Sequence, residues 1–413
     1  MVGLVHWMLS SHHRNQGDVM QHQEQVRTMK LLLERLDTDT NVDTGHAVRN
    51  PISAYTCQDR AKAEWEQMFQ SFPQVMGLSG DLPEQGSFLT SYDLGKPILM
   101  TRDRDGQFRA FLNVCSHRGT IVETEPRGRR NTFSCPFHAW TYDLGGSLVA
   151  VPKENHFGEI DKACHGLVEL TAEERHGLLF VHPEPGTTFD LENLLGETLS
   201  AELESWGYGD LEFGALDRFD TPMNWKLGID TFGETYHFQV LHRETLGKQL
   251  YGNVQCYDTY GRNHRMLLCS REIDSFRDQP ESSWEVLKAT TPVYYLFPNV
   301  QLIPNGRIPG LPHSMLQGAT LVRIYPVADD PARSFSQVSF YTHPDVPMEV
   351  REGMSERLAR FSEIIRDEDY VAAASSHIGA ESGALTHFMF GRNEPALHHY
   401  HNTYNEFLGL PSL

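Results

Sequence analysis

The chain has 413 residues, of which 39% are hydrophobic and 22% are charged, enough for two or three domains with cores of their own. Its 35 basic and 55 acidic side chains give a formal charge of −20, and such a surface should repel nucleic acid and anionic membranes. No apolar run approaches the roughly 20 residues that a membrane span needs, so we expect neither nucleic acid nor a membrane as a partner.

The start of the chain and its cysteines indicate a cytoplasmic protein. The segment MVGLVHWMLSSHH contains only a short apolar stretch with no basic residue before it, which is not typical of a signal peptide. The cysteines are too sparse in a chain of this length to suggest a disulfide framework. They are Cys57, Cys115, Cys135, Cys164, Cys256 and Cys269.

The predicted elements change character near residue 80. Residues 22–38 and 58–70 show helical patterns, whereas the following runs are short and alternate between apolar and polar residues. Asp105-Gly106 and Gly145-Gly146 are typical hairpin turns between such strands. We therefore assign residues 1–80 to an N-terminal extension with helices and residues 81–185 to an all-β domain.

Residues 186–413 have mixed character. The segment DTPMNWKLGIDTFGETYHF is predicted to be helical after Pro222, and a long helical stretch is predicted from near Pro347 through the 370s. Between them lie the strand-like runs RMLLCSRE, PVYYLFPNVQLI, GATLVRIYPV and SFSQVSFYTH. Strands followed by helices predict the α+β class, with an antiparallel sheet flanked by helices.

The all-β domain contains two close pairs of cysteine and histidine. Cys115 and His117 form the first pair, and Cys135 and His138 form the second. Thiolate and imidazole are both ligands for iron and zinc. Because each pair supplies one of each, the set suits a two-iron cluster in which one iron takes both thiolates and the other both imidazoles. A structural zinc site is the competing hypothesis.

This stretch resembles the Rieske [2Fe–2S] proteins. The resemblance implies that Cys115 and Cys135 bind one iron of a cluster, and that His117 and His138 bind the other. It would make residues 81–185 a Rieske [2Fe–2S] domain. The residues that carry the match beside the four ligands are Arg118, Gly119, Pro136, Trp140 and Tyr142.

A second constellation follows in NWKLGIDTFGETYHFQVLH, residues 224–242. Glu234 and His237 lie three apart and would share a face of a helix. His237 and His242 lie five apart, about 140° around a regular helix, and cannot both point at one metal from it. We therefore predict a π-bulge, a kink or a helix end between them. Two histidines and a carboxylate form the facial triad of non-haem Fe(II) oxygenases.

The segment resembles the catalytic motif of Rieske non-haem iron oxygenases, in particular the terminal oxygenase alpha subunits of the aromatic-ring-hydroxylating dioxygenase family. The resemblance implies that His237 and His242 bind a mononuclear Fe(II) in a catalytic domain at 186–413. It implies that Glu234 bridges the two metal centres by bonding both His237 and His138. In the family this bridge crosses a subunit interface, so a ring-shaped homotrimer is implied.

The third iron ligand is expected in RDEDYVAAASSHIGAESGA, which resembles the family's acidic helix. Asp369 fits best and Asp367 is the reserve, while a solvated charged face is the competing interpretation. Asp230 stands where the family often has Glu, which marks it for attention. The histidines of GRNEPALHHYH are interpreted as structural or surface groups.

The expected activity is that of the oxygenase component of a multi-component system. Electrons would come from NAD(P)H through a separate reductase, with or without a ferredoxin, because no G-x-G-x-x-G loop opens a helix after a strand. O2 would be the cosubstrate for mono- or cis-dihydroxylation, or for oxidative demethylation. The alternatives are a Rieske electron carrier with a non-catalytic binding domain and a zinc-stabilised binding protein.

The substrate is expected to be a small organic molecule held in an apolar pocket. An aromatic compound is the first expectation and a quaternary amine the second, because aromatic side chains and negative charge favour cations. A steroid or terpenoid is the third. The stretch 292–315 is expected to line the pocket, with core packing as the competing role for its candidates Tyr294, Phe297, Leu302 and Met315.

Overall fold

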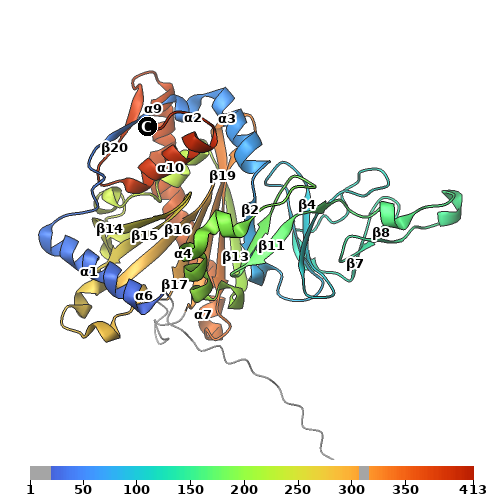
Figure 1. Ribbon diagram of the computed structural model, residues 1–413, viewed down its shortest axis with the longest axis horizontal. Coiled ribbons are helices and arrows are strands. Elements are labelled where there is room, and N and C mark those ends of the chain that lie inside the picture. The colour runs from blue at the N-terminus through green and yellow to red at the C-terminus, as the bar shows by residue number, and fades with distance from the viewer. Residues whose placement is uncertain (1–19, 307–315) are drawn as a thin grey trace, which may run out of the picture.

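The computed structural model describes residues 20–306 and 316–413. A larger body of helices around a sheet carries a smaller body of strands at one end, drawn on the right of Figure 1. None of the helices in the described part of the chain combines the length and the apolar character required to cross a bilayer.

The N-terminal segment wraps around the larger body. Helix α1, His22–Thr38, confirms the first predicted helix, and α3, Gln58–Glu64, continues into the π-helical turn η1, Trp65–Phe69. Between them, β1, Val48–Pro51, pairs antiparallel with β20, His387–Phe390, and is followed by α2, Ser53–Thr56. The pairing of β1 with β20 ties this segment to the C-terminal part of the chain.

The smaller body consists of antiparallel strands, which confirms the all-β expectation. Its sheets have the orders β10-β5-β4-β3-β6, β11-β12-β2 and β7-β8-β9. The outer boundaries at residues 80 and 185 remain predictions. The strands are β2 Gln74–Leu78, β3 Ser87–Ser91, β4 Ile98–Arg102, β5 Phe108–Leu112, β6 Arg127–Arg129, β7 Thr132–Ser134, β8 Thr141–Asp143, β9 Leu148–Ala150, β10 Glu169–Leu170, β11 Ala172–Arg175 and β12 Leu178–Val181.

The larger body is built on a seven-stranded antiparallel sheet of order β13-β19-β18-β17-β16-β15-β14, as predicted for the catalytic domain. Its strands are β13 Glu212–Thr221, β14 Leu250–Tyr260, β15 Asn263–Ser270, β16 Thr290–Leu296, β17 Val300–Asn305, β18 Gly318–Val327 and β19 Asp330–Thr342. Its helices are α4 Leu191–Trp206, α5 Trp225–Asp230, α6 Val286–Ala289, α7 Met348–Glu352, α8 Met354–Ile364, α9 Tyr370–Glu381 and α10 Pro395–Phe407.

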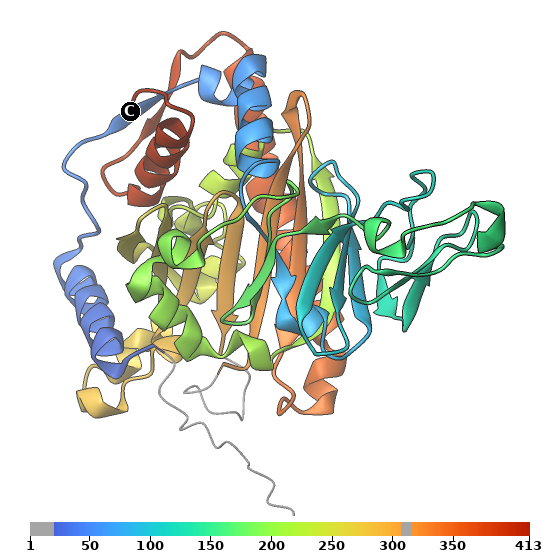
Figure 2. The same ribbon diagram turned by 45° about the vertical axis from the view of Figure 1, so that its right-hand side comes forward.

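Helices cover the two faces of this sheet, and the period-2 alternation of its strands decides which residues meet which helices. Leu267 of β15 packs in a core with α1 and α4, whereas its neighbours Met266 and Leu268 pack on the opposite face with Phe361 of α8. Figure 2 shows α4, in green, in front of the strands and the orange-to-red run of α8 and α9 behind them. The face toward α8 also carries the main cavity.

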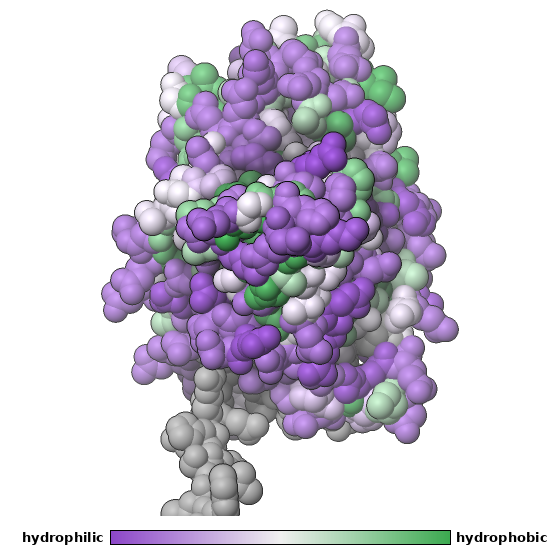
Figure 3. All heavy atoms as spheres, turned by 90° about the vertical axis from the view of Figure 1, so that its right-hand side faces the viewer, coloured by the Kyte–Doolittle hydropathy of each residue, from purple (hydrophilic) through white to green (hydrophobic). Residues whose placement is uncertain are grey.

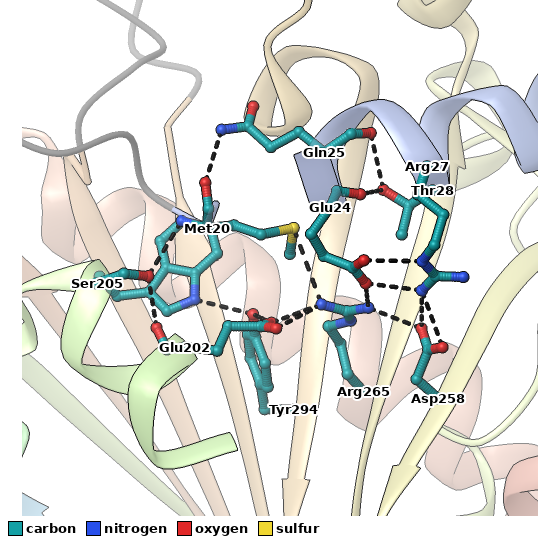
Figure 4. A network of polar contacts seen from close by, with 11 residues as sticks. Met20, Glu24, Gln25, Arg27, Thr28, Glu202, Ser205, Asp258, Arg265 and Tyr294 are labelled. Atoms are coloured by element: carbon teal, nitrogen blue, oxygen red, sulfur yellow. Dashed lines mark hydrogen bonds and ion pairs between the residues drawn. The ribbon is translucent and has the colours of Figure 1, made fainter. Parts of the chain in front are cut away.

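A buried charge network fixes α1 and α4 to the sheet (Figure 4). Arg265 of β15 is fully buried. Its guanidinium lies 2.6 Å from the carboxylate of Glu202, 2.5 Å from that of Glu24 and 2.7 Å from that of Asp258. The three acids come from α4, α1 and β14, so one guanidinium joins three separate elements to the sheet. We call this set the Arg265 network.

Candidate functional site

The two Cys/His pairs lie in loops of the same shape, which we call the cluster loops, residues 115–120 and 135–140. In the first loop the N–H of Cys115 donates to the Thr120 carbonyl (2.8 Å), and the N–H of Gly119 donates to the Cys115 carbonyl (2.9 Å). In the second, Cys135 donates to Trp140 (2.8 Å) and the fifth residue donates back to Cys135 (2.9 Å). This fifth residue is left-handed in both loops, with φ of 79° and 58°.

The repeated turn brings the predicted ligands together. Cys115 and Cys135 are 2% and 3% exposed in a shared core, and the His117 and His138 rings lie 4.7 Å apart between centroids. The His117 ring stacks on Trp140, and the buried Nδ1 of His138 has no hydrogen-bond partner in the described chain. A buried imidazole nitrogen left without a partner fits a metal ligand.

The spacing of these ligands favours a cluster over a single ion. Within residues 20–306 and 316–413, only His237, His242 and Asp369 form a set of three or more His, Cys, Asp or Glu ligand atoms within 4.8 Å of one another. The four cluster-loop ligands are spread more widely, as two bridged irons require. The residues therefore fit a [2Fe–2S] cluster better than the tetrahedral zinc of the competing hypothesis.

The second constellation follows a short helix. The side chain of Asn224 accepts the N–H of Lys226 (3.1 Å) and caps α5, whose helix ends at Asp230. The longer helix predicted after Pro222 is therefore wrong. Just beyond the helix end, Gly233 packs so closely against α10 that a Cβ there would lie 2.6 Å from Leu397. The next element is the 3₁₀ turn η6, Tyr236–Gln239.

Breaking the helix lets the two histidines converge. His237 lies in η6 and His242 lies beyond its end, which confirms the predicted irregularity between them. Their ring centroids are 4.9 Å apart. The Nε2 atoms of His242 and His237 lie 3.1 Å and 3.4 Å from one oxygen, Oδ1 of Asp369. We call these three residues the triad.

The carboxylate of the triad comes from a π-helical turn. This turn, η10, Ile365–Asp369, inserts between α8 and α9 and directs Asp369 inward, where it is buried. Asp367 instead lies on the surface and pairs with Arg366 at 2.7 Å. The structure thus places Asp369, and not the reserve Asp367, beside the two imidazoles. Such turns are frequent at functional sites.

Each imidazole of the triad carries a carboxylate on its other nitrogen. Nδ1 of His237 bonds Glu234, and Nδ1 of His242 lies 2.7 Å from Glu368. Metal-bound histidines are commonly oriented in this way. Glu368 was not predicted, because the run RDED contains three acids and only the π-turn decides which of them faces His242.

The electrostatics of the triad suit a cation. Burial on its own would raise the pKa of Asp369, but the neighbouring imidazoles of His237 and His242 outweigh burial and lower it. Burial lowers the pKa of His237, but Asp369 and Glu234 outweigh burial and raise it to about 9. Nε2 of His237 is buried without a hydrogen-bond partner in the described chain. A divalent metal bound here would replace the proton that lies between Asp369 and the imidazoles.

The main cavity opens beside the triad and has a volume of about 550 Å³. Strands β16 and β17 line it, as predicted, but through Val293 and Ile303. Tyr294 and Leu302 do not line the cavity, because alternate residues of a strand face opposite sides of the sheet. Tyr294 instead accepts a hydrogen bond from Trp206 in the core behind the sheet (2.8 Å). Phe297 also packs in a core, and Met315 lies outside the described residues.

Asp230 anchors from behind the segment that leads to the two histidines of the triad. Its carboxylate accepts hydrogen bonds from the Tyr55 hydroxyl (2.7 Å) and from His401 (2.9 Å). His401 of α10 is fully buried and also contacts Asn50 through Nδ1 (3.0 Å). This histidine therefore has the structural role predicted for it, and the shorter acid at position 230 joins α2, α5 and α10.

Two family models match the chain, first one for the smaller body and then one for the larger body. The Rieske [2Fe-2S] domain matches residues 72–166, and the ring hydroxylating alpha subunit (catalytic domain) matches residues 208–410. A cluster-binding β domain followed by this catalytic domain defines a class of iron oxygenases. The chain belongs to the Rieske-type ring-hydroxylating alpha subunits, whose cofactors are a [2Fe–2S] cluster and a mononuclear iron.

Relatives with known activities match parts of the chain. The carnitine monooxygenase oxygenase subunit of Acinetobacter baumannii is 30% identical over 210 residues, 51% of this chain and 57% of that protein. Biphenyl 2,3-dioxygenase subunit alpha of Rhodococcus jostii is 31% identical over 188 residues, 44% of this chain and 41% of that protein. The chain thus spans about half the length of these relatives.

Solved structures share the fold over most of the chain. The quaternary ammonium Rieske monooxygenase CntA in complex with L-carnitine superposes with a TM-score of 0.71 at 21% identity, covering 87% of this chain and 94% of that one. A naphthalene 1,2-dioxygenase mutant bound to phenanthrene superposes with a TM-score of 0.68 at 18% identity, covering 89% and 93%.

Proposed function

We propose that the protein is the terminal oxygenase of a Rieske system and hydroxylates or demethylates a small organic substrate with O2. The observation that carries the proposal is the convergence of His237, His242 and Asp369 beside a largely apolar cavity, in a chain that also carries the cluster loops. A pure electron carrier would need neither this triad nor the cavity.

The residues present fit both metal groups. When bound, the [2Fe–2S] cluster supplies single electrons and the mononuclear iron activates O2. The proposed ligands are the four Cys and His residues of the cluster loops and the three residues of the triad. The protein's own contribution is to orient the imidazoles through Glu234 and Glu368 and to exclude water with the apolar cavity wall. One hydroxylation consumes one O2, two electrons and two protons, and it releases one water.

Glu234 is proposed to link the two centres between chains. Its carboxylate bonds Nδ1 of His237, and it lines both the main cavity and a smaller hollow of about 190 Å³. Within one chain the cluster loops lie beyond the β13 edge of the sheet, while η6 contacts β14 at the opposite edge (Figure 1). Seven strands span about 29 Å at 4.8 Å per step, which one carboxylate cannot bridge.

The surfaces suit such a contact between copies. The end of the smaller body carries apolar side chains within a hydrophilic surface (Figure 3), and Phe137, beside His138, is 56% exposed. Beside His237, Tyr236 and Val240 are 66% and 79% exposed and line another hollow. We propose a trimer in which the cluster end of one chain covers η6 of the next, because exposed apolar patches commonly mark interfaces.

The remaining proposed partner is the protein that supplies the two electrons for each hydroxylation. We propose a separate NAD(P)H-dependent reductase, with or without a ferredoxin, as the donor. A cytoplasmic location is proposed because none of the six cysteines forms a disulfide in the structure, as expected in a reducing compartment.

Metal analysis combined with isotope labelling tests the function. Purified protein should contain three irons per chain and show the visible absorption of a Rieske cluster. With a surrogate reductase and ¹⁸O₂, a screen of small organic compounds should yield hydroxylated products that retain ¹⁸O, or demethylated products with release of formaldehyde. Two irons per chain would indicate the electron carrier instead, and a colourless protein would indicate the zinc protein.

A further inference from the structure

Two arginines of α8 line the main cavity away from the triad. Arg357, Arg360, Phe361 and Ile364 all line this cavity. Their spacing of three, four and seven residues places them on one face of the helix. The same helical run continues through η10 to Asp369. The wall of the cavity therefore carries two guanidinium groups at one end and the triad at the other.

These two arginines differ from the arginines before and after them in the chain, on α7 and η10. Arg351 pairs with Glu212, and Arg366 pairs with Asp367 at 2.7 Å. For Arg357 and Arg360, the described part of the chain offers no acid within ion-pair distance. Two cations that line a cavity without an acidic partner among the described residues are available to an anionic ligand.

The cavity itself offers them no counter-charge. Among the described lining residues the only acids are Glu234 and Asp369, and both are held by the triad imidazoles. Between the two ends the wall is mainly apolar, with Leu268, Val293 and Phe340 among its residues. A ligand that fills this cavity thus meets an apolar middle and a cationic end.

The strand ends add a polar rim to the cavity. Asn305 pairs with Gly318, and Gly318 pairs with Thr342, so the ends of β17 and β19 and the start of β18 lie side by side. All three residues line the cavity. Backbone and side-chain donors at such a rim suit a hydrogen-bonded ligand group better than a hydrocarbon one.

We infer that the substrate carries a carboxylate at one end of an apolar body, and that Arg357 and Arg360 bind this carboxylate while the carbon to be oxidised lies at the triad. The inference rests on the proposed function only in treating the cavity as the substrate site. With a helix rise of about 1.5 Å per residue, the Cα atoms of Arg360 and Arg357 lie roughly 13 and 18 Å from that of Asp369. The acid group is therefore remote from the reacting carbon.

The charge pattern opposes a purely cationic substrate. A lone quaternary ammonium, the second expectation from the sequence, would be repelled by both guanidiniums. A neutral hydrocarbon would leave them without a partner and gain nothing from them. A carboxylate matches the planar donor fork of arginine in geometry as well as in charge.

The test compares matched probes on the protein with both iron centres loaded. The probes are ω-phenylalkanoates with two to six methylene groups, the corresponding primary amides and the corresponding trimethylammonium compounds. Kd is measured anaerobically by isothermal titration calorimetry, without turnover. We expect the best carboxylate to bind about tenfold more tightly than its amide, the factor that one charge-assisted pair supplies. The trimethylammonium compound should bind more weakly still.

Variants assign the preference to the arginines. In the double variant Arg357→Gln/Arg360→Gln the carboxylate preference should disappear, and each single variant should reduce it. Arg351→Gln, on the preceding helix α7 and paired with Glu212, should keep it. The preference should also weaken with added salt, because the guanidiniums are exposed. Thermal unfolding checks each variant, and if the double variant does not fold, the single variants decide.

Three results would overturn the inference: no carboxylate in the series binds, amide or cation binds as tightly as carboxylate, or the preference survives in the variants. Failure of the proposed function is distinguishable. If the carboxylates bind through the arginines but none is ever oxygenated, the anion site stands and the activity fails. If neutral compounds are oxygenated with no preference for carboxylates, the activity stands and the anion site fails.

Discussion

At the residue scale, the two nitrogens of each triad imidazole have different partners. Nε2 faces Asp369, and Nδ1 is held by a carboxylate, Glu234 for His237 and Glu368 for His242. An anionic partner on Nδ1 fixes the ring orientation and raises the basicity of Nε2. The geometry of the triad therefore depends on four carboxylate and imidazole contacts between residues of two short segments, 234–242 and 368–369.

Asp369→Ala should remove the mononuclear iron while the cluster remains, because only this carboxylate completes the triad. Iron per chain should fall from three to two with the visible spectrum of the cluster unchanged. Asp367→Ala, which alters an exposed acid paired with Arg366, is the matched control and should retain three irons. Loss of iron in the control, but not in Asp369→Ala, would contradict the ligand assignment.

Glu368→Gln should weaken iron binding without abolishing it. The amide still occupies the site beside Nδ1 of His242, but it lacks the negative charge that supports the ligand. Loss of such a partner typically lowers metal affinity about 10- to 100-fold, measured here by competition with a chelator. The spectrum of the cluster should not change. An affinity equal to that of the wild type would show that Glu368 only packs against the imidazole.

Glu234→Gln should leave both metal sites loaded and slow the transfer of electrons between them. In single-turnover experiments with a compound that the wild type hydroxylates, reoxidation of the reduced cluster by O2 should slow at least tenfold, since a charged hydrogen-bonded link is lost. Glu244→Gln changes an exposed acid two residues beyond His242 and is the control. Unchanged reoxidation in Glu234→Gln would refute the bridge.

Local spacing predicted the site residues that lie close together in the sequence. It did not predict residues whose role depends on the direction in which the fold points their side chains. The segments around Cys115 and His237 were recognisable because their ligands are close in sequence. Val293 could not be preferred over Tyr294, since a buried strand has apolar residues on both faces and the sequence does not say which face meets the cavity. Glu368 depends on one π-turn, which inserts a residue without any composition signal.

At the scale of elements, the Arg265 network should contribute strongly to stability. Arg265→Met would leave the carboxylates of Glu24, Glu202 and Asp258 close together without their shared cation. Breaking a buried pair in this way costs about 3–5 kcal/mol, measured as the free energy of unfolding from urea titrations. Lys30→Met also lies on α1 but breaks an exposed pair with Glu281, and should change stability by about 0.5 kcal/mol or less.

The same network should make stability depend on pH in the acid range. Burial alone would raise the pKa of Glu24, but hydrogen bonds from Arg27 and Arg265 outweigh it and lower the pKa below its ordinary value of 4.5. A carboxyl with a lowered folded-state pKa stabilises the protein above its ordinary value and loses this effect as pH falls through the folded-state value. The Tm difference between wild type and Glu24→Gln should therefore be largest above about pH 5 and shrink below pH 4.5. A difference that does not change with pH would contradict this.

Elements with strong periodicity were predictable, and those created by tertiary contacts were not. The helix at His22–Thr38 and the strands of the large sheet follow patterns of 3.6 and 2 residues. The helix predicted after Pro222 stops at Asp230, and the close packing of Gly233 against α10 just beyond it is a tertiary contact that the local sequence does not show. The pairing of β1 with β20 joins segments more than 330 residues apart and has no local signal.

At the scale of the whole molecule, the proposed electron path predicts that two inactive variants restore activity when they share a trimer. Cys135→Ser removes a cluster ligand, and Asp369→Ala removes a triad ligand. In a single chain neither variant can complete the path.

If the cluster of one chain serves the triad of the next, a mixed trimer contains a contact between an intact cluster and an intact triad. Co-expression with two affinity tags and tandem purification should therefore yield trimers with about a third of the wild-type rate, since one of the three contacts in any mixed ring pairs two intact centres. Trimers that remain inactive, with both metals present at the expected ratios, would show that electrons move within a chain, and the placement of the cluster loops beyond the β13 edge would then need a large domain movement to explain it.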